Sequence, residues 1–210
     1  MKIFGINFTI SPNKEKPIFV AEGVLKNDGN LIISLINRLN DFQSFEDFLS
    51  DRGPWFCGLN FPFGLPLRFV KNMSLPITWP EYIDIIAKWG KPDFVKKVSA
   101  FKKSQSKDNK EPLRITDALA HAQSPLRLTN APKARMFYEG APRLLDSGVS
   151  IIPCRPMDNE RCVIEACPAL IARRFSENYK YDDNSNRESS RKSILEGLSS
   201  KAVKSEFGFN

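Results

Sequence analysis

The sequence feature that most limits the fold is an apolar run from Trp55 to Phe61, in which Asn60 is the one polar residue. Gly53-Pro54 precedes the run and Pro62 follows it, so its length is that of a β-strand. An apolar run of strand length is typical of a strand buried on both faces of a sheet. A sheet buried in this way needs helices over it, and an α/β fold is therefore expected.

The other segments predict the order of strands and helices. Strand-like segments at 2–9, 17–25 and 31–35 are joined by short polar turns and should form an antiparallel meander. Another buried strand is expected at 162–166, and helices are expected around 45–49, 78–89, 93–101, 134–147, 168–175 and 191–199. We therefore expect a mixed five-stranded sheet with helices on its faces, in one domain spanning 1–210, with a helical insertion around 66–147.

Length and composition exclude several protein classes. The 210 residues are enough for one full hydrophobic core, and 41% hydrophobic with 26% charged residues is typical of a globular protein. No apolar stretch approaches the roughly 20 residues that span a bilayer, and the start resembles a strand rather than a signal peptide. We expect a cytoplasmic protein without membrane attachment or an obligate protein partner. Four cysteines without a close CxxC pair, and one histidine (His121), predict neither a zinc site nor a disulfide framework.

The formal net charge of +7 raises the expectation of an anionic partner. Much of the excess lies in one lysine-rich segment, which contains Lys88, Lys91, Lys96, Lys97, Lys102, Lys103, Lys107 and Lys110. One interpretation is a solvated helix face followed by a polar loop. The other is a surface that contacts the phosphate backbone of DNA or RNA. Few aromatic residues are interleaved there, so this segment does not predict a base-stacking platform.

Asn7 and Asn60 each lie at the carboxyl end of an apolar strand. Ligand sites of open α/β sheets are built at such ends, and asparagine is a poor strand residue. Either residue alone is explained by a buried amide that holds a strand end through hydrogen bonds. Two equivalent placements favour a shared site.

Glu165 lies between apolar neighbours, shortly before Pro168, which opens a helix. A carboxylate in such a place is unfavourable unless it is paired or bound to a metal. The sequence leaves two alternatives: a ligand role, or a salt bridge with Arg173 or Arg143.

Several motifs together resemble one known family. They are Gly5 to Thr9, Gly58 to Pro66, Ser124 to Leu128, Met136 to Leu144 and Glu165 to Pro168, followed by Tyr179-Lys180 and Arg191 to Leu195. In this order they are similar to the predicted nucleases of the domain-of-unknown-function family numbered 429, and the resemblance covers nearly the whole chain. It implies an RNase H-like fold and metal-dependent hydrolysis of phosphodiesters.

The resemblance also implies the roles of particular residues. Asn7, Asn60 and Glu165 would hold Mg²⁺ or Mn²⁺, and with Asp117 they would form the catalytic set. Glu139 is a further acidic candidate. Positively charged residues would bind the phosphates of the substrate, unless they are surface or ion-pair residues: Arg114, Arg127, Arg143 and Lys180.

The chain departs from the family at two points. The family carries Asp where this sequence has Asn7 and Asn60, and the loss of two charges should weaken a divalent site. The family also continues into another strand and an Asp-bearing helix, so we expect the domain to lack its C-terminal element. Three hypotheses follow: an impaired nuclease, a non-catalytic nucleic-acid-binding relative, and a degenerate or truncated product. A phosphotransferase of the actin-like superfamily is disfavoured because paired Gly-rich phosphate loops are not seen.

Overall fold

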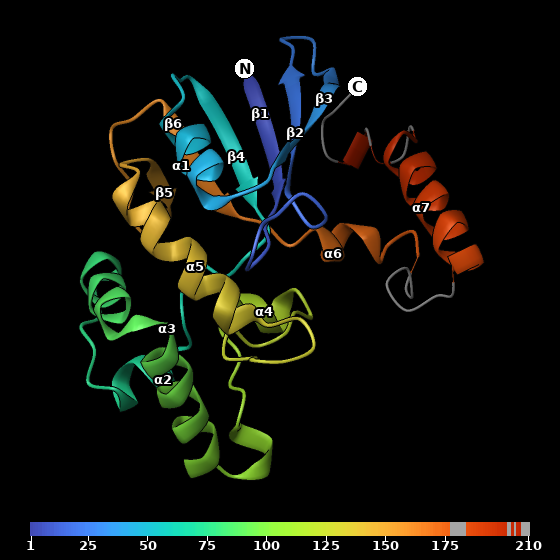
Figure 1. The fold of residues 1–210 in the computed structure, drawn as a ribbon. Helices are drawn as coiled ribbons and strands as arrows, with labels where there is room; N and C mark the ends of the chain where they lie inside the picture. Colours follow the sequence, from blue (N-terminus) through green and yellow to red (C-terminus); the bar gives the residue numbers. More distant parts are fainter. Residues whose placement is uncertain (177–183, 201–202, 204, 207–210) are drawn as a thin grey trace.

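A computed structural model describes residues 1–176, 184–200, 203 and 205–206 (Figure 1). Its strands are β1 (Lys2–Asn7), β2 (Ile18–Leu25), β3 (Leu31–Leu39), β4 (Trp55–Leu59), β5 (Ser150–Ile152) and β6 (Arg161–Glu165). Its helices are α1 (Phe42–Ser50), α2 (Leu67–Asn72), α3 (Trp79–Ser104), the 3₁₀ helix η1 (Lys107–Asn109), α4 (Ile115–Leu119), α5 (Lys133–Asp146), α6 (Pro168–Ala172) and α7 (Asn184–Leu198). The fold is α/β, as the apolar patterning predicts.

The strands form one mixed sheet in the order β3-β2-β1-β4-β6-β5. The first three strands pair antiparallel, which confirms the predicted meander, and β4, β6 and β5 continue in parallel from β1. The prediction of five strands is wrong, because the described residues contain six. The extra strand, β5, has three residues and ends before Pro153. So short a segment has no periodicity of its own, and it becomes a strand because β6 offers a free edge.

One face of the sheet packs on α1, and α1 and α5 both lie across this face in Figure 1. Phe4, Ile6 and Val20 of the sheet and Phe45 and Leu49 of α1 belong to the same buried core. These side chains recur at every second strand position, and α1 presents its apolar stripe to them.

The opposite face of the sheet is open over β1, β2 and β3. Gly5, Asn7 and Phe19 are exposed there, whereas their chain neighbours point into the core. Nearly every residue of β3 is exposed, on both faces of the strand. Over β1, β2 and β3, the helices of the described residues therefore cover one face of the sheet and leave these side chains on the other face exposed.

The stretch 66–147, expected to be a helical insertion, contains α2 to α5. Helix α3 is kinked at Gly90, whose φ of 76° is left-handed, and Pro92 follows the kink. Beyond the kink, the ring of Phe94 stacks on that of Tyr138 in α5, with 5.3 Å between ring centroids. Helix α5 approaches the strand ends closely because Gly140 faces the ring of Phe61 and leaves no room for a side chain.

Candidate functional site

The parallel strands β1, β4 and β6 end side by side, and this carboxyl edge of the sheet brings together the polar residues predicted from the sequence. In the register, Ile6 lies beside Leu59, and Leu59 lies beside Glu165. The backbone N–H of Asn60 donates to the carbonyl of Ile6 at 3.0 Å, which continues the pairing beyond β4. The side-chain amide Nδ2 of Asn60 donates to Oδ1 of Asn7, also at 3.0 Å. The two asparagine side chains are therefore in direct contact at this edge.

Glu165, on the third strand of this edge, has a partner that was not expected. Its Oε2 accepts a hydrogen bond from the backbone N–H of Phe63 at 2.9 Å. The guanidinium of Arg114 reaches both carboxylate oxygens, with Nη1 2.7 Å from Oε2 and Nη2 2.5 Å from Oε1. Of the two alternatives for Glu165, the structure therefore shows the salt bridge, but with Arg114 rather than with Arg173 or Arg143. Arg173 donates to the carbonyl of Ala120 instead.

Asp117 binds the other side of the same guanidinium. Nε of Arg114 lies 2.8 Å from Oδ2 of Asp117, and Nη2 lies 2.7 Å from Oδ1. Asp117 also accepts from the backbone N–H of Arg114, which fixes the first turn of α4. We call Arg114, Asp117 and Glu165 the arginine triad. Exposed fractions of 16%, 5% and 33% for the three side chains show that water screens this group only in part.

The arginine triad has a clear electrostatic character. Burial alone would disfavour the charge of Arg114, yet the hydrogen bonds and charges of Asp117 and Glu165 outweigh it and raise the pKa of the guanidinium. Arg114 is therefore a permanent cation between two acids, and the triad carries one negative charge when both acids are ionised. The nearby Cys154 thiol is affected too: burial, with the charge of Glu165, raises its pKa to about 11.

These contacts do not fit the Mg²⁺ or Mn²⁺ ions that the resemblance implies. The three strand ends offer two amides and one carboxylate, and Asn7 Oδ1 already accepts from Asn60. Both oxygens of Glu165 accept from Arg114, so a guanidinium lies where a cation would have to bind. Within the described ranges, no group of three or more His, Cys, Asp or Glu is placed to hold a metal ion. Hard divalent cations need such oxygen donors to be free.

The other candidate residues do not join this site. Arg143 forms ion pairs with Glu46 at 2.9 Å and Glu139 at 3.3 Å, and its guanidinium lies 3.8 Å from the ring centroid of Phe42. Glu139 is further paired with Lys91. Arg127 donates to the carbonyl of Thr129. Lys180 lies outside the described residues.

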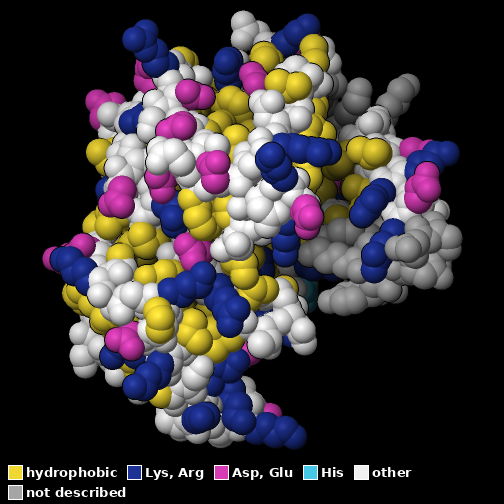
Figure 2. Space-filling model, viewed as in Figure 1, with side chains coloured by type: hydrophobic (Ala, Val, Ile, Leu, Met, Phe, Trp, Pro, Cys, Tyr) yellow, Lys and Arg dark blue, Asp and Glu magenta, His cyan; other side chains and the backbone are white. Residues whose placement is uncertain are grey.

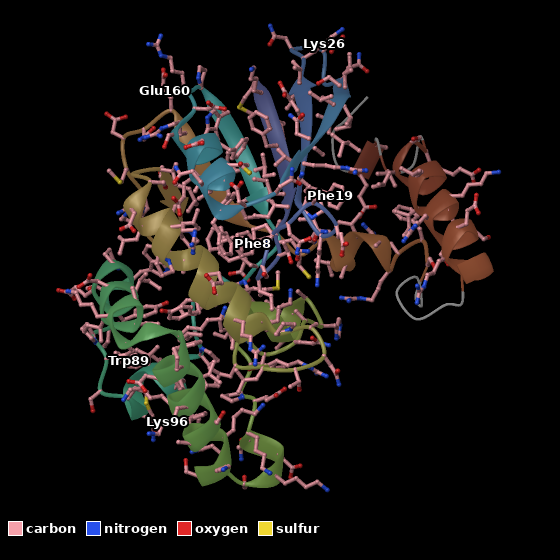
Figure 3. All side chains as sticks on the ribbon, in the orientation of Figure 1. Phe8, Phe19, Lys26, Trp89, Lys96 and Glu160 are labelled. Atoms are coloured by element: carbon pink, nitrogen blue, oxygen red, sulfur yellow. The ribbon has the colours of Figure 1, made fainter. Side chains whose placement is uncertain are left out.

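Four residues of the lysine-rich segment form no ion pair with any residue that the structure describes. In the same segment, Lys88, Lys91 and Lys102 are paired with acids, and Lys97 lies over the ring of Trp89. We call the remaining four exposed residues the lysine surface: Lys96, Lys103, Lys107 and Lys110. Figure 2 shows Lys and Arg side chains gathered where the end of α3 lies, and Figure 3 places Lys96 on α3, away from the carboxyl edge.

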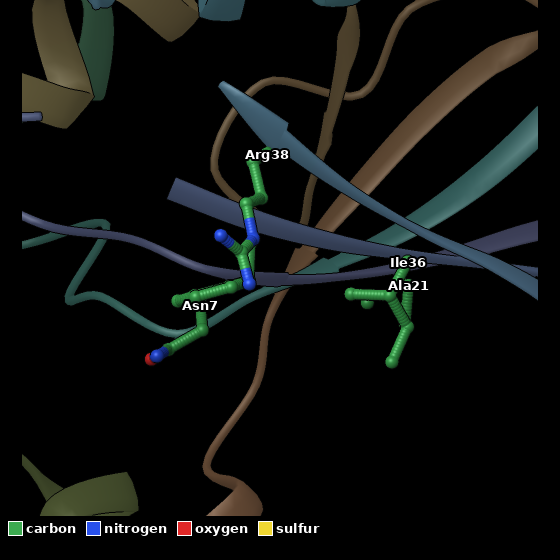
Figure 4. A pocket seen from close by; sticks show the side chains of 6 residues that line it. Asn7, Ala21, Ile36 and Arg38 are labelled. Atoms are coloured by element: carbon green, nitrogen blue, oxygen red, sulfur yellow. The ribbon is translucent and has the colours of Figure 1, made fainter. Parts of the chain in front are cut away.

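The sequence did not single out Phe19 and Arg38, which form one row with Asn7 across the open face of the sheet. Figure 4 shows Arg38 and Asn7 on this face. Both residues lie in strands, without a motif around them that would indicate a site. Their exposure depends on which face of the sheet the helices leave open. The sequence therefore carried no signal for them.

Comparisons with protein-family models, with curated proteins and with solved structures gave no match. No helix in the described part of the chain has the length and apolar character needed to cross a membrane.

Proposed function

We propose that this chain is a non-catalytic relative of RNase H-like nucleases that binds nucleic acid without cleaving it. The observation that carries the proposal is the contact of Arg114 with both carboxylate oxygens of Glu165. Phosphodiester hydrolysis by two metal ions requires carboxylates that bind the cations. Here Glu165 is the only carboxylate among the described ends of β1, β4 and β6, and its charge is paired with that of Arg114.

The arrangement of the sheet supports the RNase H-like part of the proposal. Three antiparallel strands followed by parallel strands are the arrangement expected from the resemblance. The polar residues at the ends of β1, β4 and β6 occupy the corresponding edge. Asn7 and Asn60 keep the size of the family's aspartates and lose their charge, so the same edge would repel a phosphate backbone less than two aspartates would.

The charge distribution supports nucleic acid as the partner. The chain carries a formal charge of +7, and the lysine surface adds four exposed ammonium groups without acidic partners among the described residues. Lysine ammonium groups that neutralise phosphates release counterions, so binding through them should weaken steeply as salt is added.

The binding test is a fluorescence-anisotropy titration with labelled DNA and RNA at several salt concentrations. We expect a triple variant, Lys96→Gln, Lys103→Gln and Lys107→Gln, to bind at least about tenfold more weakly and with a shallower salt dependence. The matched control, Lys2→Gln, Lys26→Gln and Arg52→Gln, removes the same charge at exposed positions near the start of β1, in the β2–β3 turn and in the loop before β4. These positions lie at the edge of the sheet opposite to the ends of β1 and β4. Equal losses in both variants, or no binding at low salt by the unmodified chain, would refute the proposal.

The cleavage test uses DNA, RNA and hybrid substrates with Mg²⁺ or Mn²⁺. We expect no cleavage above a buffer control. Metal-dependent cleavage by the unmodified chain that is abolished by Glu165→Gln would show that the nuclease activity persists, and the non-catalytic proposal would be wrong.

A further inference from the structure

A shallow hollow of about 540 Å³ lies on the open face of the sheet, beside Asn7 (Figure 4). The strand register explains its outline. Asn7 of β1, Phe19 of β2 and Arg38 of β3 form one row across the three strands, and Gly5, Ala21 and Ile36 form the next row. Successive residues of a strand point to opposite faces, so all six side-chain positions are on this face.

The floor of the hollow is flat because its central residues are small. A Cβ added at Gly5 would meet no atom within 4 Å, and the neighbouring residue on β2 is Ala21. Larger apolar side chains border the floor: Phe19 is 37% exposed and Ile36 is 64% exposed. A flat floor next to an exposed aromatic ring suits a planar ring system, which could lie against Gly5 and stack on Phe19.

Two polar groups lie at the same end of the hollow. The Arg38 guanidinium carbon is 5.6 Å from the ring centroid of Phe19, and Arg38 forms no ion pair with a described residue. Asn7 uses its Oδ1 to accept from Asn60, which leaves its Nδ2 group available to donate. An available cation and an amide donor at the rim of an apolar floor would recognise a ligand with an anionic group and a carbonyl or ring acceptor.

We infer that this hollow binds one unpaired nucleotide, with its base on Phe19 and the glycine floor and its phosphate on Arg38. The amide of Asn7 would donate to an acceptor of the base or sugar. This inference rests on the proposed function and names the part of the nucleic acid that the sheet contacts, a single-stranded segment. A simple anion would not need the apolar floor, and a purely apolar ligand would leave the guanidinium without a partner.

The test measures affinity for a labelled single-stranded oligonucleotide of about 12 residues, for the matching duplex and for a mononucleotide. Gly5→Val fills the floor, and the open space around Gly5 lets the strand accept it. Arg38→Gln removes the cation, and Arg52→Gln, exposed in the loop before β4, is the matched control. Photo-crosslinking from a halogenated base, with the linked peptide identified by mass spectrometry, locates the contact independently of affinity.

We expect Gly5→Val and Arg38→Gln each to weaken single-strand binding by about tenfold, with duplex binding and the Arg52→Gln control unchanged. The crosslink should fall on the peptide that contains Phe19. Mononucleotide binding at similar affinity would identify a free nucleotide as the ligand. If only the lysine-surface variants weaken binding and no crosslink reaches β2 or β3, the hollow is not a nucleotide site although the proposed function holds. If the unmodified chain binds no nucleic acid and no nucleotide, both proposals fail.

Discussion

The amide of Asn60 donates to the side-chain oxygen of Asn7 across 3.0 Å, and this bond joins the ends of β1 and β4. Each residue lies where the resemblance inferred from the sequence leads one to expect an aspartate. Two ionised carboxylates at this separation would repel each other unless a cation lay between them. The asparagine pair therefore stabilises this edge of the sheet without a metal ion.

The double variant Asn7→Asp, Asn60→Asp tests this relationship. We expect the free energy of unfolding to fall by about 1–3 kcal/mol without divalent cations, because the hydrogen bond becomes a repulsion between two acids. Millimolar Mn²⁺ should restore part of the loss, and chemical denaturation with and without Mn²⁺ measures both effects. The control Asn27→Asp, Asn37→Asp adds the same charge at exposed positions. A double variant as stable as the parent in a chelating buffer would show that the two side chains are not in contact.

Arg114→Gln should be strongly destabilising. It leaves the buried Asp117 and the partly buried Glu165 without their cation, and removal of one partner from such a group typically costs about 3–5 kcal/mol. Replacing both acids as well, by Asp117→Asn and Glu165→Gln, should recover much of the loss because no charge is then left unpaired. Urea denaturation of the single and triple variants gives the comparison. If Arg114→Gln changes stability no more than the exposed Arg52→Gln, the arginine triad is not formed in solution.

The Cys154 thiol should react slowly at neutral pH. Only the thiolate is alkylated, and burial together with the charge of Glu165 raises the thiol pKa to about 11. Raising the pH from 8 to 10 should therefore increase the alkylation rate by about 100-fold, since the thiolate fraction grows tenfold per pH unit below the pKa. Glu165→Gln removes a negative charge that disfavours the thiolate, so it should lower the pKa of Cys154 and speed the reaction at pH 8.

Pulse labelling with iodoacetamide, followed by peptide mass spectrometry, measures the rates. Glu160→Gln is the control, and an equal acceleration by both variants would contradict the assignment.

Gly140 and Gly5 should respond oppositely to alanine. A Cβ at Gly140 would lie 2.4 Å from the ring of Phe61, so Gly140→Ala should destabilise by about 1–3 kcal/mol despite the better helix propensity of alanine. Gly5→Ala meets no atom within 4 Å and should change stability by less than about 0.5 kcal/mol. Thermal unfolding of the two variants measures both effects. If both substitutions leave the stability unchanged, Gly140 of α5 does not pack closely on Phe61.

The edge strand β3 should promote self-association at high protein concentration. It has nine residues and, in the described part of the chain, only one neighbouring strand, and its exposed apolar side chains include Ile33 and Leu35. Ile33→Lys with Leu35→Lys should reduce the association seen by sedimentation velocity, because charges on an edge disfavour pairing with another strand. The control Ile115→Lys, Leu119→Lys introduces the same charges on the exposed face of α4. Equal effects of both variants would assign the association to general surface hydrophobicity.

Much of the fold followed from local patterns. The meander, the buried strand from Trp55 and the helix that ends near Gly148 are encoded in alternation, apolar runs and turn residues close together in the chain. The local sequence pattern predicted the start of α1 less accurately. The sequence suggested a helix at 45–49, whereas α1 begins at Phe42 and is capped by Asp41, which accepts from the N–H of Ser44. Several polar residues in a row offer more than one capping choice, and packing of Phe45 and Leu49 selects the register.

By itself the sequence determined that Asn7 and Asn60 each end an apolar strand, which favours a shared site at one edge of the sheet. Their direct contact depends on the parallel pairing of β1 with β4, which the tertiary structure shows. The partner of Glu165 was decided only by the tertiary structure. Arg114 lies 51 residues away, and a long flexible side chain can pair with any acid that folding brings within reach. The open face of the sheet was likewise a tertiary outcome, since the alternation of Phe19 and Arg38 with buried residues is the same whether or not a helix covers them. Patterns between near neighbours in the chain are set by backbone geometry, whereas charge pairing and exposure depend on which distant segments the fold brings together.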